Sequence, residues 1–179
     1  MTDVLLSGRH DAVLTLTINR PDALNGTAAG AGLSVALACD VRIAAAGVQL
    51  IVVFARVGLV PDAGSLFFLT RMLGLSKATE LAMTADPLTA EDGVTLGLIA
   101  MVVPAEQLMT TAMARATGFA QGPRRTYALI KAGMERALSG DLEQVMELES
   151  QLQARAARTP DAQEAIRALL EKRKPVFKG

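Results

Sequence analysis

Apolar and polar side chains alternate over residues 12–19, which predicts a strand that pairs with residues 4–7 in a hairpin. The Arg20-Pro21-Asp22 stretch ends this hairpin, because proline cannot donate to a strand ladder. The other short apolar segments are expected to form one buried helix, over 31–38, and three strands, over 41–45, 50–54 and 99–103.

Helical patterns dominate the rest of the chain. Thr89 followed by Asp92 is typical of a helix N-terminal cap, and Thr159 before Pro160 places a capping residue next to a proline suited to the first helical position. The expected helices span 63–73, 76–84, 89–96, 105–120, 123–139, 141–158 and 161–173.

The helices expected after residue 123 carry apolar side chains at three- to four-residue spacing. A lone helical hairpin cannot bury both sides of such surfaces, so ordinary core packing is the favoured interpretation and a functional groove is the alternative. The apolar residues that follow this helical spacing are Leu129, Ile130, Met134, Leu138, Leu142, Val145, Met146, Leu148 and Leu152.

Composition narrows the class of protein. With 179 residues, 51% of them hydrophobic, the chain is long enough to bury one hydrophobic core but too short for two domains of ordinary size. Eighteen basic and eighteen acidic residues give no electrostatic case for binding nucleic acid or an anionic membrane. The single cysteine, Cys39, excludes an intrachain disulfide, and the single histidine, His10, argues against a metal site. Without a signal sequence or an uninterrupted apolar span, a soluble cytoplasmic protein is expected.

Residues 26–40 combine a small-residue turn with the start of an apolar helix. Glycines at 26, 30 and 32 let the backbone approach a ligand closely. The N–H groups at the start of a helix have no partner within it, and they suit a negatively charged oxygen. The turn therefore predicts an oxyanion-stabilising site, with a tight helix-to-helix approach at Gly30-Ala31-Gly32 as the alternative.

A second motif, Gly58-Leu59-Val60-Pro61-Asp62-Ala63-Gly64, holds one carboxylate between a proline and a turn of small residues. Asp62 is a candidate general acid and base. The alternative is that Asp62 only caps a helix that begins near Ala63, a common role for aspartate.

These two motifs resemble those of the crotonase family, the enoyl-CoA hydratases and isomerases. The resemblance extends to residues 18–25, 88–99 and 171–177. It implies an α/β fold with a ββα spiral core over 1–120 and a C-terminal helical oligomerisation region over 121–179. It also implies homotrimers or dimers of trimers that act on acyl-CoA thioesters. CoA is then part of the substrate, and no other cofactor, metal, nucleic acid or membrane is expected.

The chain departs from the family pattern at Asn25–Gly26. In the family, roughly 70 to 80 residues separate the two segments that are fused here. The resemblance places in that stretch a second oxyanion-hole N–H and a loop that holds the CoA adenine. The gap is consistent with a deletion in the protein, or with an internal segment that this sequence omits.

The resemblance also assigns roles to individual residues. The Ala31 N–H takes the oxyanion-hole position, and Asp62 matches an aspartate of family isomerases. Ser34 and Phe54 stand where family hydratases carry two glutamates, which disfavours hydration. The expected substrate contacts are Gly30, Gly32, Phe54, Pro61 and Lys172. Lys172 is expected near a CoA phosphate, and the alternative is a solvated lysine at a helix end.

The favoured function is therefore a CoA-thioester isomerase, of the double-bond or ring-epoxide type known from phenylacetate catabolism. A non-catalytic, shortened homologue that serves as an assembly or thioester-binding module is the alternative. Residual hydratase activity comes third.

Overall fold

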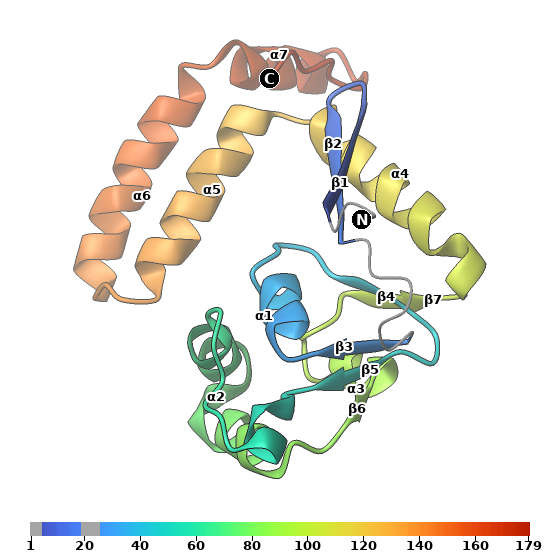
Figure 1. Ribbon diagram of the computed structural model, residues 1–179. Helices are drawn as coiled ribbons and strands as arrows, with labels where there is room; N and C mark the ends of the chain where they lie inside the picture. Colours follow the sequence, from blue (N-terminus) through green and yellow to red (C-terminus); the bar gives the residue numbers. More distant parts are fainter. Residues whose placement is uncertain (1–4, 19–25) are drawn as a thin grey trace. The chain divides into compact units, whose positions relative to one another are not determined.

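The N-terminal hairpin forms as the alternation predicts. The computed structural model describes residues 5–18 and 26–179 (Figure 1). β1 (Leu5–His10) and β2 (Val13–Ile18) make a two-stranded sheet. The Arg20-Pro21-Asp22 stretch and Asn25, where the family segment is missing, lie outside the described residues.

Short strands that are distant in the sequence pair in the next part of the chain. β3 (Thr27–Ala29) and β5 (Gln49–Ile51) are parallel, and β6 (Leu88–Thr89) pairs antiparallel with β5. β4 (Ile43–Ala45) and β7 (Met101–Val103) form a separate parallel pair. The expected strands at 41–45 and 99–103 are confirmed, whereas β3 and β6 were not predicted.

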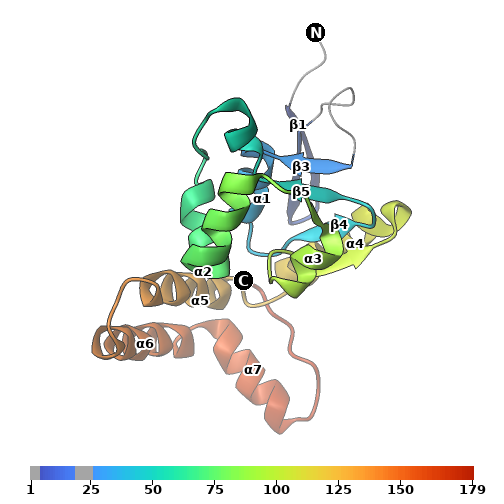
Figure 2. The same cartoon turned by 90° about the horizontal axis from the view of Figure 1, so that it is seen from below.

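Three helices cover these strands. α1 (Ala31–Leu37) packs against β3 and α2 (Ser65–Thr84), while α3 (Ala90–Thr95) packs against β5 and β7 (Figure 2). Gly93 of α3 leaves no room for a side chain, because an added Cβ would lie 2.8 Å from Ile99 Cγ1 and 2.9 Å from Leu50 Cδ1. The buried core comprises Leu33, Leu37, Ala44, Leu50, Val52, Phe54, Leu69, Ala78, Leu81, Ala90, Leu98 and Ile99.

Two expectations in this region are wrong in detail. The strand expected over 50–54 ends at Ile51, and Val53–Val57 form a 3₁₀ helix closed by Gly58 in the left-handed conformation. α2 begins at Ser65 rather than near Ala63, because Ala63 (φ 50°) and Gly64 (φ 86°) are both left-handed. Within α2, Gly74 (φ 75°, ψ 164°) separates the two helical segments that the sequence predicts.

The chain divides into two compact units. One contains Met1–Leu6 and Thr17–Ala112, and the other contains Ser7–Leu16 and Met113–Gly179. α4 (Leu108–Ala120) follows a 3₁₀ turn at Ala105–Gln107 and passes from the first unit into the second. The core and oligomerisation regions expected at 1–120 and 121–179 stay a prediction, since they concern self-association.

The second unit is helical, as predicted. α5 (Arg124–Ala137) and α6 (Leu142–Ala157) form a helical hairpin, followed by α7 (Pro160–Leu170) (Figure 1). The expected caps are confirmed: Thr89 and Asp92 form a reciprocal capping box at α3, and Thr159 Oγ1 accepts a hydrogen bond from the Ala162 N–H at 3.1 Å.

The C-terminal tail folds back along α7. The Lys178 and Gly179 N–H groups donate to the two carboxylate oxygens of Asp161, at 2.8 and 3.0 Å. Glu164 binds the Arg173 guanidinium through both oxygens and accepts a hydrogen bond from the Val176 N–H at 3.1 Å. Two carboxylates of α7 therefore hold the tail in place.

This attachment should weaken in acid. The bond from Arg173, followed by that from the Val176 N–H, lowers the pKa of Glu164 from 4.5 to about 2. Because the folded-state pKa is depressed, the stabilising contribution is present above pH 4.5 and is lost as the pH falls towards about 2. Limited proteolysis of the tail as a function of pH should show this loss. Glu164→Gln should abolish this pH dependence of tail cleavage, whereas the matched change Glu147→Gln on α6 should leave it unchanged.

Candidate active site

The first half of the candidate site is the turn at the start of α1. Gly30 is buried and has φ 53° and ψ −131°, a combination that only glycine adopts readily. Among residues 5–18 and 26–179, no side chain caps α1 at its first turn, which begins with Ala31. Ala31 and Gly32 are exposed. The Ala31 N–H therefore lies at an exposed, uncapped helix start, and its role as an oxyanion donor stays a prediction.

The tight helix-to-helix approach considered for this turn is not found. A Cβ added at Gly32 would meet no atom within 4 Å, and one added at Gly30 would meet Val53 Cγ1 at 3.4 Å and Phe54 Cζ at 3.8 Å. Gly30 is required by its backbone conformation rather than by a neighbouring helix.

The second half of the site is the turn around Asp62. The side chain of Asp62 is exposed, and no hydrogen bond or ion pair joins it to another described residue. Gly64, not Asp62, is the N-cap of α2, and no side chain caps that helix. The helix-cap interpretation of Asp62 is therefore wrong, and its carboxylate is free to exchange a proton.

The two turns are linked by the hydroxyl of Ser34. Its Oγ lies 3.2 Å from the Gly30 carbonyl oxygen, 3.1 Å from the Asp62 carbonyl oxygen and 2.5 Å from Ser65 Oγ. The two carbonyl oxygens therefore both lie within hydrogen-bonding distance of one atom. The structure brings together the backbones of the two motifs that the sequence singled out.

Ser65 was missed by the sequence reasoning. A signal was present, since Ser34 interrupts an apolar helical stretch and Ser65 stands directly before another. A buried hydroxyl in such a stretch needs a partner, and another buried hydroxyl can supply it.

The remaining expected contacts of this unit surround the same turns. Phe54 is 8% exposed and lies beside Gly30, so it contributes an apolar surface there. Pro61 is half-buried, while Leu59 and Val60 are 63% and 71% exposed. Apolar residues thus directly precede Asp62 in its turn.

Lys172 belongs to the other compact unit. It is exposed, and its ammonium makes no hydrogen bond or ion pair with the rest of the described chain. Its backbone is left-handed (φ 53°), and the Lys172 and Arg173 N–H groups donate to the carbonyls of Leu169 and Ala168. This is the Schellman arrangement, in which glycine usually takes the left-handed position. The phosphate contact expected of Lys172 stays a prediction.

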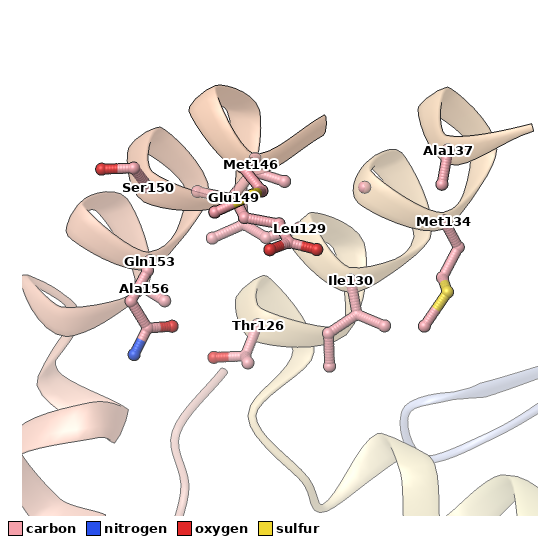
Figure 3. A pocket seen from close by; sticks show the side chains of 12 residues that line it. Thr126, Leu129, Ile130, Met134, Ala137, Met146, Glu149, Ser150, Gln153 and Ala156 are labelled. Carbon is pink, nitrogen blue, oxygen red and sulfur yellow. The ribbon is translucent and has the colours of Figure 1, made fainter. Parts of the chain in front are cut away.

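A groove of about 550 Å³ lies between α5 and α6 (Figure 3). Ile130, Met134 and Met146 line it and are 50%, 70% and 58% exposed. The core packing expected of this apolar set is not found within the described chain, because no side chain of α5 or α6 is fully buried and Leu138 and Leu142 are also exposed. The self-association expected of this region stays a prediction.

The described residues lack two kinds of feature. No helix among them is both long and apolar enough to cross a membrane. Residues 5–18 and 26–179 also contain no group of three or more histidine, cysteine or acidic side chains that could hold a metal ion.

Comparison with known proteins supplies the family. The sequence profile described as enoyl-CoA hydratase/isomerase matches residues 10–179. The 1,2-epoxyphenylacetyl-CoA isomerase of Escherichia coli is 38% identical over 157 residues, which cover 88% of this chain and 60% of that protein. The trans-2-decenoyl-acyl-carrier-protein isomerase of Streptococcus mutans is 37% identical over 155 residues, 87% of this chain and 59% of that protein.

Solved structures agree with this result. The crystal structure of an enoyl-CoA hydratase from a Polaromonas species superimposes with a TM-score of 0.82 at 33% identity, covering 86% of this chain and 60% of the other. The chain belongs to the enoyl-CoA hydratase/isomerase family, and the crotonase-like fold expected from the sequence is confirmed. It spans about 60% of the length of the curated relatives that it matches.

Proposed function

We propose that this chain isomerises an acyl-CoA thioester, with Asp62 as the proton carrier and the Ala31 N–H as an oxyanion donor. The observation that carries the proposal is the distribution of carboxylates in the site. Ser34 and Phe54, at the positions of the hydratase glutamates, are buried in the core, whereas the carboxylate of Asp62 is exposed and unpaired. One free carboxylate suits proton transfer within a substrate better than the addition of water.

The proposed reaction moves one proton. The Asp62 carboxylate takes a proton from the carbon between the double bond and the carbonyl of a β,γ-unsaturated thioester. The electron pair of the broken C–H bond passes to the thioester oxygen, and the Ala31 N–H stabilises the resulting dienolate. The protonated Asp62 then returns the proton to the γ-carbon, which leaves an α,β-unsaturated thioester and restores the carboxylate.

Two named relatives support an isomerase, one described as acting on a ring-epoxide CoA thioester and one on a decenoyl thioester of acyl-carrier protein. The chain's own substrate is proposed as an acyl-CoA thioester, with Gly30, Gly32, Phe54 and Pro61 around its acyl end. Lys172 is the proposed contact for a CoA phosphate, and the proposed assembly is a trimer or a pair of trimers.

The test is to incubate the protein with a β,γ-unsaturated acyl-CoA in deuterated water and to follow the products by NMR. We expect an α,β-unsaturated thioester that contains deuterium. A hydroxyacyl product would instead show a hydratase and contradict the proposal. Binding of the thioester without exchange would favour the shortened, non-catalytic module, since one oxyanion donor contributes roughly 10²–10³-fold to the rate.

A mass measurement should accompany this assay. An intact mass of 18.8 kDa for the protein isolated from its own cells corresponds to the 179 residues of this chain. A mass several kilodaltons higher would show that the natural protein contains a further segment, and the assay should then use that longer chain.

A further inference from the structure

Two buried hydroxyls lie where the Gly30 and Asp62 turns meet. Ser34 is fully buried and Ser65 is 1% exposed, in a core otherwise formed by apolar side chains. Each of the two backbone carbonyls near Ser34 already accepts one backbone hydrogen bond. The Ser34 N–H donates to Gly30 at 3.1 Å, and the Ser65 N–H donates to Asp62 at 2.9 Å. The Ser34 hydroxyl is a second, shared donor to both.

Each of the two serine hydroxyls has one proton to donate, and the acceptors within reach decide the direction of the Ser34–Ser65 hydrogen bond. The Ser65 hydroxyl has no acceptor among the described residues other than Ser34 Oγ. If Ser34 donated to Ser65, the proton of Ser65 would be buried without an acceptor, which is unfavourable. Ser65 therefore donates to Ser34, and the Ser34 proton is left for the carbonyls of Gly30 and Asp62.

This arrangement joins segments that are distant in the sequence. Two serines that merely satisfied each other would need no further contact. Ser34 Oγ also lies near the carbonyl of Gly30, four residues before it, and near the carbonyl of Asp62, 28 residues after it. The residue after Gly30 carries the proposed oxyanion donor, and Asp62 carries the proposed proton carrier.

We propose that Ser34 is a positioning residue, which holds the Asp62 turn at a fixed distance from the Ala31 N–H. The Ser65 hydroxyl directs the proton of Ser34 but does not itself bond to either carbonyl. The effect on the reaction rate rests on the function proposed above, whereas the link between the two turns does not.

Three variants separate positioning from simple stability. Ser34→Ala removes the link and leaves the buried Ser65 hydroxyl without a partner. Ser34→Ala/Ser65→Ala removes the link but leaves no unpartnered hydroxyl. Ser65→Ala keeps the link, because the Ser34 proton still reaches the carbonyls. We therefore expect the single Ser34 variant to be the least stable of the three, and the double variant to regain part of that loss.

The rate should follow a different order. A small displacement of the reacting groups lowers the rate of the chemical step strongly. We therefore expect kcat of Ser34→Ala and of the double variant to fall by on the order of 10- to 100-fold, with KM little changed. Ser65→Ala should stay within about threefold of the unmodified protein. If kcat recovers with stability in the double variant, or if Ser34→Ala keeps full activity, the proposal is wrong.

A readout without catalysis completes the experiment. Amide hydrogen exchange of Ser65, whose N–H donates to Asp62, should accelerate about tenfold or more in both variants that lack the Ser34 hydroxyl, but not in Ser65→Ala. Unchanged exchange in Ser34→Ala would overturn the link itself. If the unmodified protein lacks isomerase activity but the Ser34 variants still exchange the Ser65 amide faster than it does, the link is supported and the proposed function is contradicted.

Discussion

Replacing Asp62 by asparagine should slow proton exchange into an unsaturated acyl-CoA by on the order of 10²–10⁴-fold, the usual contribution of a positioned acid and base. The unfolding midpoint should not change, because the carboxylate makes no hydrogen bond or ion pair with the described residues and Gly64 is the N-cap of α2. For the same reason Asp62→Ala should be no less stable than Asp62→Asn. Deuterium incorporation and chemical denaturation measure the two effects.

The chain offers a matched control for this experiment. Asp141 is a true N-cap, since its Oδ1 accepts a hydrogen bond from the Gln144 N–H at 2.9 Å. Asp141→Ala should therefore cost about 1 kcal/mol of stability, with no effect on exchange. An Asp62→Asn variant that exchanges at the normal rate would exclude Asp62 as the proton carrier.

Gly64→Ala should destabilise the protein by roughly 1–2 kcal/mol, the cost of placing a side chain in the left-handed region. Gly64 has φ 86°, and an added Cβ would lie 2.9 Å from Phe68 Cε2. The neighbouring Ala63 has φ 50° and already bears that cost. Ala63→Gly therefore serves as the control and should not lower stability.

Chemical denaturation of the two variants compares them directly. If Gly64→Ala unfolds at the same midpoint as the unmodified protein, the left-handed turn before α2 is not required. Because this turn carries Asp62, the destabilised variant should also show faster amide exchange at Ser65.

Much of the fold follows from local patterns in the sequence. The helices and their caps were predicted because the signals lie within a few residues of each other, as with Thr89 and Asp92. β3 and β6 were not predicted, because strands of three and two residues show no periodicity. Those strands are defined by pairing with β5, which is remote from both in the sequence.

The candidate site shows the same division. The Gly30 turn and the Asp62 motif were recognised from the residues they contain. The contact between Ser34 and Ser65 spans 31 residues, and it depends on how α1 packs against α2. The position of Asp62 just before an expected helix suggested a cap. The left-handed residues that follow Asp62 delay the start of that helix, so Asp62 does not cap it.

The left-handed Lys172 has a consequence for protein engineering. Glycine is the residue best suited to that helix end, so a library selected for heat resistance should enrich Lys172→Gly. If Lys172 binds a CoA phosphate, the same selection would discard an affinity determinant in exchange for thermal tolerance. Heat-resistant variants of this chain should therefore be screened for ligand affinity as well as for melting temperature, because the helix end and the proposed phosphate contact make opposite demands on Lys172.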